Sequence, residues 1–329
     1  MEALLAAGAP WPGAVAVSGG GDSIALMHLL AHWAQATGRE PPHVLTVDHG
    51  LRDNSAADAR KVSGWAKRAG LKAIALRWTG PRPKSDIEAA AREARYRLMG
   101  KHVRKKKLTA LYVGHTRDDQ AETFLLRLMR GSGLDGLAAM RAVAPYPLPG
   151  YRDLCIVRPL LALERDAVRE HLRANDHAWL EDPMNEEDRF ARVRLRQLWP
   201  QLEQAGITRA RVAAAAGHLT RAREALEGVT AAVLARAVRR VENTVHVDPG
   251  ALTSAPREVG LRALAQLLMI VSGQSYRPRF ERLERLFDRI DTKEIGRGVT
   301  LHGCKIATAP SNKGAFGPGT LVIAREFES

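Results

Sequence analysis

The chain has 329 residues, of which 45% are hydrophobic, so it is long enough for two domains, or one domain with an appendage, and can bury a sizeable core. Lysine and arginine exceed the acids by 14 charges, which indicates a polyanionic partner such as a nucleic acid, although a merely solvated basic surface would give the same excess. The two cysteines, Cys155 and Cys304, lie far apart, which excludes a disulfide framework and a CxxC metal or redox site.

The N-terminus does not read as a secretion signal, because Met1 to Pro12 lacks a basic segment and a sufficient apolar core. No run of about 18 apolar residues, the length of a membrane-spanning helix, occurs elsewhere in the sequence. We therefore expect a cytoplasmic protein that does not cross a membrane.

The first part of the chain alternates short apolar strands with helices. We expect strands at 14–17, 43–47, 72–78, 108–113 and 155–157, and helices at 23–36, 55–69, 86–104, 118–130, 164–174 and 189–202. Consecutive apolar strands separated by helices are typical of a parallel sheet that is covered on both faces. The sequence therefore predicts a doubly wound α/β domain, in which ligands bind beyond the carboxyl ends of the strands.

The composition changes after Gly206, and we predict two domains, residues 1–204 and residues 205–329. The second is expected to be mainly helical and basic, with helices at 209–226, 230–241, 256–272 and 277–290 and a short β piece at 299–301, 304–307 and 320–324. Its arginines alternate with alanines and suit contacts to RNA phosphates, which position RNA without reading its sequence. A solvated helical bundle would have the same composition.

A glycine-rich loop, Ser18-Gly19-Gly20-Gly21-Asp22-Ser23, joins the first strand to the first long helix, with Asp22 or Ser23 as the expected N-cap. Glycines allow positive φ and let a phosphate approach backbone N–H groups, and the following helix adds the positive end of its dipole. Neither GxxxxGK[ST] nor GxGxxG matches this spacing. The loop therefore predicts an anion site of another kind, unless it is only a tight connection.

Two other strand ends carry polar residues. Asp48 and His49 follow the second strand, beside the expected nucleotide, although a turn with a capping Asp would look the same. After the fourth strand, Asp118-Asp119-Gln120-Ala121-Glu122-Thr123 begins a helix. Asp118 and Glu122 are four residues apart, and Asp119 and Glu122 three, so the acids can share one face and converge on a cation or an amine. Complementation of the helix dipole is the alternative for these acids. We expect all three strand ends to meet in one cleft.

Several motifs occur together in the order and spacing of one family. They are Ser18–Ser23, Val47–Arg52, Ala91–Tyr96, Gly114–His115 with Asp118–Thr123, Arg130–Leu137, and Glu181–Pro183 followed by Arg192 and Arg196. With these motifs the chain resembles the bacterial tRNA(Ile)-lysidine synthetases of the ATP-pyrophosphatase, or PP-loop, superfamily. The C-terminal third resembles them only in its general make-up, basic helices and a short β piece, and not in specific motifs.

The resemblance implies an ATP-dependent ligase that joins L-lysine to C2 of the wobble cytidine in the tRNA(Ile) with a CAU anticodon. It implies an adenylated RNA intermediate, with AMP and pyrophosphate as products. Residues 18–23 would then hold ATP, namely Ser18, Gly19, Gly20, Gly21, Asp22 and Ser23, with Asp48 and His49 beside the nucleotide. Mg²⁺ would be held by Asp22 and Asp119. Catalytic roles would fall on Asp22, on Asp119 and Glu122 near the lysine amine, and on Arg192 or Arg196 near the adenylated intermediate.

The chain departs from the family pattern at Thr116, where a second histidine is frequent, and at Val193, where asparagine is usual. It is also shorter than the longer members, so we expect little room for a full second C-terminal domain. Two other functions are open: tRNA thiolation, which usually needs cysteines for sulfur transfer or a cluster, and non-catalytic nucleotide sensing by an RNA-binding protein. The acids Asp22, Asp119 and Glu122 argue against the second.

Overall fold

The computed structural model describes residues 1–50, 54–80, 87–181, 191–274, 276–296, 298–310 and 312–326. The chain divides into two compact units, residues 1–220 and residues 221–329. Each unit has its own hydrophobic core.

The first unit is built on a six-stranded sheet with the order β3-β2-β1-β4-β6-β5. Its strands are β1 (Ala14–Ala16), β2 (His43–Asp48), β3 (Ala73–Arg77), β4 (Ala110–Tyr112), β5 (Val143–Pro145) and β6 (Cys155–Val157). All pairs are parallel except β5 with β6. The predicted parallel sheet is confirmed. The antiparallel edge strand β5 was not predicted, because its segment is rich in proline and glycine.

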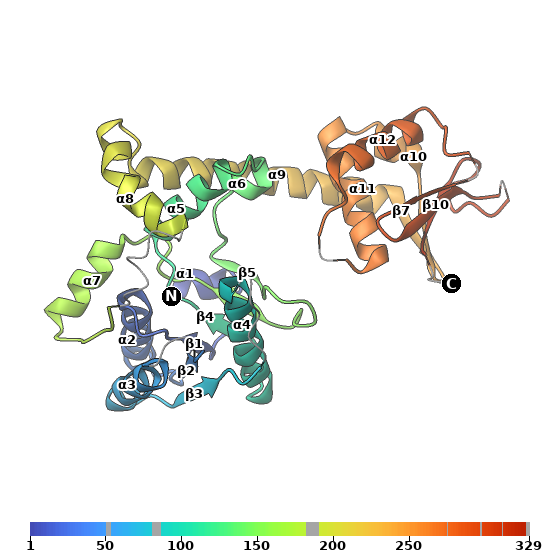
Figure 1. Cartoon of the computed structure of the whole chain (residues 1–329). Helices are drawn as coiled ribbons and strands as arrows, with labels where there is room; N and C mark the ends of the chain where they lie inside the picture. The colour runs from blue at the N-terminus through green and yellow to red at the C-terminus, as the bar shows by residue number, and fades with distance from the viewer. Residues whose placement is uncertain are drawn as a thin grey trace. The chain divides into compact units, whose positions relative to one another are not determined.

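Helices cover both faces of this sheet (Figure 1). The helices of the first unit are α1 (Glu2–Ala6), α2 (Gly21–Ala36), α3 (Ser55–Arg68), α4 (Ile87–Lys105), α5 (Arg117–Leu128), α6 (Leu134–Leu137), α7 (Arg165–Ala174) and α8 (Ala191–Gln204), together with the start of the helix that follows α8. Because side chains alternate along a strand, Val15 and Val44 pack in a core with α2, α3 and α7, whereas Ala14 and Leu45 pack in a core with α4. The two-sided burial explains why the strands are apolar throughout.

The strand order reverses between β1 and β4. From β1 the chain proceeds to β2 and β3 on one side, and then crosses to β4 on the other side of β1. In open α/β sheets, the loops that leave such neighbouring strands diverge and leave a crevice at the carboxyl ends. The loops that carry Ser18–Ser23 and Gly114–Asp119 leave these two strands, so the sequence motifs lie at the switch point.

The C-terminal helices differ from the prediction in one respect. Instead of two helices at 209–226 and 230–241, one helix, α9 (Arg209–Ala237), is followed by strand β7 (Val238–Val241). A glycine inside a helix costs only about 1 kcal/mol, so Gly228 does not end it. The buried hydroxyl of Thr230 also bonds within the helix, to the Leu226 carbonyl oxygen at 2.6 Å.

The predicted boundary after residue 204 falls between α8 and α9, whereas the division into compact units falls within α9. The difference has a packing reason. Val212, in the first turn of α9, is buried in a small cluster with Ala121 of α5 and Leu195 and Trp199 of α8. The start of α9 therefore belongs to the first unit.

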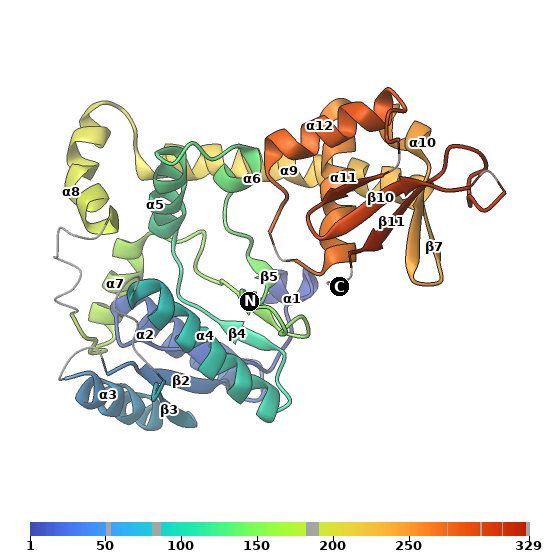
Figure 2. The same cartoon turned by 45° about the vertical axis from the view of Figure 1, so that its right-hand side comes forward.

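The second unit packs helices against an antiparallel sheet with the order β7-β8-β11-β10-β9. Besides β7 and the end of α9, it contains β8 (Thr244–Val247), α10 (Pro249–Thr253), α11 (Arg257–Ser272), α12 (Phe280–Asp291), β9 (Val299–Leu301), β10 (Cys304–Thr308) and β11 (Leu321–Arg325). Figure 2 shows β10 and β11 beside α11 and α12. The helices predicted at 256–272 and 277–290 are present as α11 and α12, and the predicted β piece forms part of this five-stranded sheet, whereas strands β7 and β8 and the short helix α10 were not predicted.

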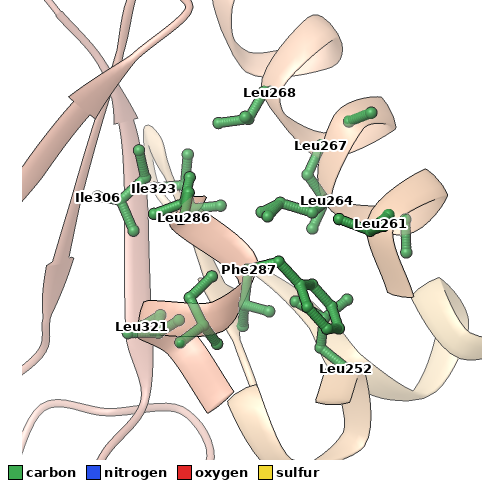
Figure 3. Close-up of a cluster of buried hydrophobic side chains, with 14 of the residues drawn as sticks. Leu252, Leu261, Leu264, Leu267, Leu268, Leu286, Phe287, Ile306, Leu321 and Ile323 are labelled. Carbon is green, nitrogen blue, oxygen red and sulfur yellow. The ribbon is translucent and has the colours of Figure 1, made fainter. Parts of the chain in front are cut away.

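The core of the second unit lies between its helices and its sheet (Figure 3). Leu264 of α11 and Phe287 of α12 lie opposite Ile306 and Ile323 of the sheet. Within the described parts of the chain, no helix is long and apolar enough to cross a membrane.

Close packing in this core generates a stability prediction. A Cβ on Gly260 of α11 would lie 2.6 Å from the Phe287 ring and 2.9 Å from the Leu252 carbonyl oxygen. We expect Gly260→Ala to destabilise the second unit by about 1–3 kcal/mol through overpacking. The control is Gly228→Ala, where nothing lies within 4 Å; it should raise stability by up to about 1 kcal/mol. Thermal unfolding followed by circular dichroism tests both, and an unchanged melting temperature for Gly260→Ala would contradict the packing.

Candidate active site

A cavity of about 350 Å³ lies at the switch point of the first unit. It is lined by the loops after β1, β2 and β4 and by side chains of α4, α7 and α8. Among the predicted site residues, those that line it are Ser18, Gly20, Gly21, Asp22, Ser23, His49, Asp119 and Arg196. Four others, Gly19, Asp48, Glu122 and Arg192, lie outside its lining. The three strand ends therefore meet in one cleft, as expected.

The glycine-rich loop is held in shape by its own hydrogen bonds. Gly19 has φ +101°, a conformation that favours glycine, and its carbonyl oxygen accepts from the Leu180 N–H at 2.9 Å. The hydroxyl of Ser23 donates to the Gly20 carbonyl oxygen at 2.8 Å and accepts from the Ser18 N–H at 3.2 Å. The N-cap is Gly20, in extended conformation, and not Asp22 or Ser23. The loop therefore presents the first turn of α2 to the cavity, as an anion site requires.

The loop after β4 packs directly on that first turn. A Cβ on Gly114 would lie 2.7 Å from the Asp22 carbonyl oxygen and 3.0 Å from the Ser23 nitrogen. Only glycine fits this approach, which brings the start of α5 next to Asp22.

Thr116, the N-cap of α5, holds Asp119 in place. Its backbone N–H and its hydroxyl donate to Asp119 Oδ2, at 2.8 Å and 3.0 Å. Thr116 is fully buried, so these bonds are sheltered from water. The residue that departs from the family pattern therefore anchors one of the predicted catalytic acids.

Arg165, the first residue of α7, joins the three predicted catalytic acids. Its Nε donates to Asp22 Oδ2 at 3.3 Å, its Nη2 to Asp119 Oδ1 at 3.0 Å, and its Nη1 to Glu122 Oε1 at 3.0 Å. Its backbone N–H donates to Asp118 Oδ2 at 2.8 Å, which ties the start of α7 to α5. Arg165 was not predicted from the sequence. Helix α7 follows strand β6. The rule that places binding groups beyond the carboxyl ends of strands therefore applies to this helix as well, and would have indicated Arg165.

Of the two candidate arginines, Arg196 is the one that reaches the acids. Its Nε and Nη2 donate to the two carboxylate oxygens of Glu122, at 2.7 Å and 3.2 Å. Arg192 lies one turn earlier on α8 and is exposed. Val193, the second departure from the family pattern, is buried in the same helix. The neighbouring motif residues Asp182 and Pro183 lie outside the described residues.

The pKa values of Asp22 and Asp119 shift in opposite directions. Burial raises the pKa of Asp22 above its ordinary value, although Arg165 opposes the shift. Burial would also raise the pKa of Asp119, but Arg165 and the hydrogen bonds from Thr116 outweigh it and lower that pKa. The pKa of Arg165 is raised, because the three carboxylates outweigh its burial. Asp119 and Arg165 therefore carry charge at neutral pH, and Asp22 is the more readily protonated acid.

The acids of this site suit a divalent cation that is held jointly with a ligand. Among the described residues, no group of three or more histidine, cysteine or acidic side chains is arranged to hold a metal. However, Asp22 Oδ1 is buried and has no hydrogen-bond partner in the part of the chain that the structure describes. Mg²⁺ is usually bound through one or two carboxylates together with substrate phosphates. The acids beside the glycine-rich loop match that mode.

Other basic groups complete the cavity. Arg92 and Arg95 of α4 and Arg169 of α7 line it, and the buried Nε of Arg169 has no hydrogen-bond partner. Burial lowers the pKa of His115 to about 4, although Asp119 opposes the shift, so the ring is neutral at pH 7. Its Nδ1 accepts from Arg158 Nε at 3.3 Å. The cavity therefore combines buried acids with arginines suited to phosphate.

Asp48 forms hydrogen bonds within the turn that follows β2. Its Oδ1 accepts from the Ser55 hydroxyl, and from the Gly50 N–H at 3.0 Å. This is the turn geometry that the sequence left open as an alternative. The hydrogen bond from Ser55 lowers the pKa of Asp48 below its ordinary value, and it outweighs the opposing effect of burial.

This turn generates a pH prediction. The pKa of Asp48 is lower in the folded state than in the unfolded state. Its contribution to the free energy of unfolding is therefore complete above the unfolded pKa near 4, and is lost as pH falls through the folded pKa. Ser55→Ala should cost about 1 kcal/mol at pH 7, and the cost should shrink below pH 4. Ser63→Ala, which removes a neutral bond to the Ala59 carbonyl oxygen, is the control. Urea unfolding across this pH range measures both, and equal pH profiles for the two variants would contradict the assignment.

Comparison with known proteins identifies the first unit. A family model described as a PP-loop domain matches residues 11–202. A solved structure, the U34-tRNA thiolase NcsA from Methanococcus maripaludis with its [4Fe-4S] cluster, aligns with a TM-score of 0.52 at 15% identity, covering 64% of this chain and 72% of that one. At this identity the likeness shows the fold alone, and it agrees with the predicted doubly wound sheet.

Curated relatives match more of the chain. A protein named tRNA(Ile)-lysidine synthase from Ruegeria pomeroyi is 41% identical over 85% of this chain and 65% of its own length. Relatives with the same name from Hyphomonas neptunium and Methylobacterium nodulans are 38% and 40% identical, over 90% and 88% of this chain and 78% and 84% of their own lengths. The chain therefore spans about two thirds of the Ruegeria relative and more of the other two. By these matches the chain belongs to the tRNA(Ile)-lysidine synthase family, with a PP-loop domain as its first part.

Proposed function

We propose that this chain is an ATP-dependent ligase that joins L-lysine to C2 of the wobble cytidine of tRNA(Ile) with a CAU anticodon. Membership of the tRNA(Ile)-lysidine synthase family supports the reaction. The observation that carries the proposal is the convergence of Asp22, Asp119 and Glu122 on Arg165 beside an anion-binding loop, at a cavity that Asp22, Asp119 and Arg165 line. The function implies the cytoplasm, where tRNA, ATP and lysine occur together.

The first step is the attack of the cytosine O2 on the α-phosphorus of ATP. An oxygen–phosphorus bond forms, the bond to the β-phosphate oxygen breaks, and pyrophosphate leaves. Residues 18–23 bind the phosphates through backbone N–H groups and the positive end of α2. Arg169, whose Nε has no hydrogen-bond partner among the described residues, adds a guanidinium beside Gly21 of the loop.

Mg²⁺ is assigned to Asp22 and Asp119. The buried, unpartnered Oδ1 of Asp22 supports this choice, together with the position of Asp22 in the first turn after the glycines. When bound, the ion neutralises charge on the phosphates and on the departing pyrophosphate.

The second step is the attack of the lysine ε-amine on C2 of the adenylated cytidine. The carbon–nitrogen bond forms, the bond from C2 to the adenylate oxygen breaks, and AMP leaves. Asp119 and Glu122 attract and orient the amine, and one of these carboxylates accepts the proton that it loses. Arg196, which Glu122 holds in place, stabilises the negative charge that returns to the AMP phosphate.

Thiolation, the rival chemistry, finds little support in the two cysteines. Cys304 is buried in the second unit, where burial raises the pKa of its thiol to about 11 and its Sγ donates to the Leu268 carbonyl oxygen at 3.4 Å. Burial also raises the pKa of Cys155, in strand β6. Reactive cysteines need a lowered pKa, so neither residue is suited to sulfur transfer.

The reaction is tested with ATP, Mg²⁺, radiolabelled lysine and a tRNA(Ile) transcript. We expect lysine incorporation with one AMP released per lysine, and none when the wobble cytidine is replaced by uridine. Asp22→Asn should lower AMP release at least about a hundredfold, because it removes a charged phosphate-site and metal ligand. Asp153→Asn is the control, since this exposed acid pairs with Arg104 outside the cavity. Absence of lysine incorporation by folded wild-type protein would refute the function.

We assign tRNA backbone contacts to the arginines of α9. Arg221 and Arg236 are exposed on this helix. Replacing either with glutamine should weaken tRNA binding, and should reduce the slope of log affinity against log salt by about one for each phosphate that the variant no longer neutralises. Glu224→Gln on the same helix should instead leave affinity unchanged or raise it. A filter-binding salt titration measures these slopes, and unchanged slopes in both arginine variants would remove α9 from the tRNA site.

A further inference from the structure

The space between the three predicted catalytic acids is filled by a side chain of the protein. Each nitrogen of the Arg165 guanidinium pairs with a different acid, at 3.0–3.3 Å. The side chains involved are sheltered, with 14% of Arg165, 10% of Asp119 and 3% of Glu122 exposed. A guanidinium in this position occupies the place where a second cation would be attracted.

The acceptor atoms of the inner pair of acids are already engaged. Asp119 Oδ2 accepts twice from Thr116, and Asp119 Oδ1 accepts from Arg165. Glu122 Oε1 accepts from both Arg165 and Arg196, and Glu122 Oε2 accepts from Arg196. An ammonium group brings three N–H donors and no acceptor. An ammonium that bridges Asp119 Oδ1 and Glu122 Oε1 competes with the Arg165 guanidinium, which pairs with both of these oxygens.

The anchoring of α7 allows the side chain to move without the helix. The backbone N–H of Arg165 is held by Asp118, whereas its guanidinium forms ion pairs at the end of a flexible stem. The cavity that receives the nucleotide is lined by Arg165 as well as by the glycine-rich loop. A triphosphate therefore places new anionic oxygens within the same cavity, and arginine binds phosphate oxygens through paired N–H groups.

We propose that Arg165 is a positioning residue that closes the lysine subsite in the free protein and opens it by transferring its guanidinium from the acids to the nucleotide phosphates. This inference rests on the proposed function. It makes lysine binding depend on prior nucleotide binding, so the amine enters only when the nucleotide that activates the cytidine is bound. By thermodynamic linkage, lysine must tighten nucleotide binding by the same factor.

The test is equilibrium dialysis of radiolabelled L-lysine against the full chain, with and without Mg²⁺ and α,β-methylene-ATP, which cannot release pyrophosphate. For the wild type we expect the nucleotide to tighten lysine binding about tenfold or more. Arg165→Met should bind lysine without nucleotide about as tightly as the wild type does with it. Arg104→Met, which loses an exposed ion pair outside the cavity, should keep the wild-type coupling. Norleucine, which lacks the ε-ammonium, should not compete.

Two results would overturn the inference while leaving the proposed function intact. One is lysine binding by the wild type that nucleotide does not change, a result that does not depend on whether the variant folds. The other is full coupling in folded Arg165→Met, which would mean that lysine and nucleotide interact without this residue. Failure of every form to bind lysine, with or without nucleotide, would instead refute the proposed function and the inference with it.

Discussion

The site depends on the compensation of three clustered carboxylates by one guanidinium. Asp22, Asp119 and Glu122 come from two different helices, and without a cation between them their burial and mutual repulsion would oppose folding of the cavity wall. Arg165 supplies that cation from a third helix. In the proposed function the same acids bind the cationic substrate, so the stability of the free protein and the binding of substrate would compete for the same oxygens.

The backbone brings these groups together through two close approaches. Gly114 lets the loop after β4 lie against the first turn of α2, and the Asp118 carboxylate ties the start of α7 to α5. Both contacts lie beyond the carboxyl ends of parallel strands, the first between β1 and β4, where the strand order reverses, and the second between the neighbouring strands β4 and β6. The fold therefore places the glycine-rich loop and the acidic cluster side by side, as the proposed reaction of a nucleotide and an amine at one cytidine requires.

The elements of the first unit were largely predictable, because apolar strands, glycine stops and helical spacing are local signals. The glycine-rich loop and the Asp119–Glu122 pair were found for the same reason. Arg165 was not, because its role depends on contacts with residues 43 to 143 positions away in the chain. Arg196 and Arg192 could be separated only by the direction in which α8 presents them. The continuous helix α9 was missed because a single glycine is a weak helix stop when buried neighbours such as Thr230 favour continuation.

The most direct measurement of the central claim is a crystal structure of the chain with L-lysine, Mg²⁺ and α,β-methylene-ATP. We expect the lysine ε-ammonium between Asp119 and Glu122, the triphosphate on residues 18–23, and the Arg165 guanidinium turned from the acids to the phosphates. Lysine bound elsewhere, with Arg165 still paired to all three acids and the nucleotide in place, would contradict the assignment of this cavity as the site of lysine transfer.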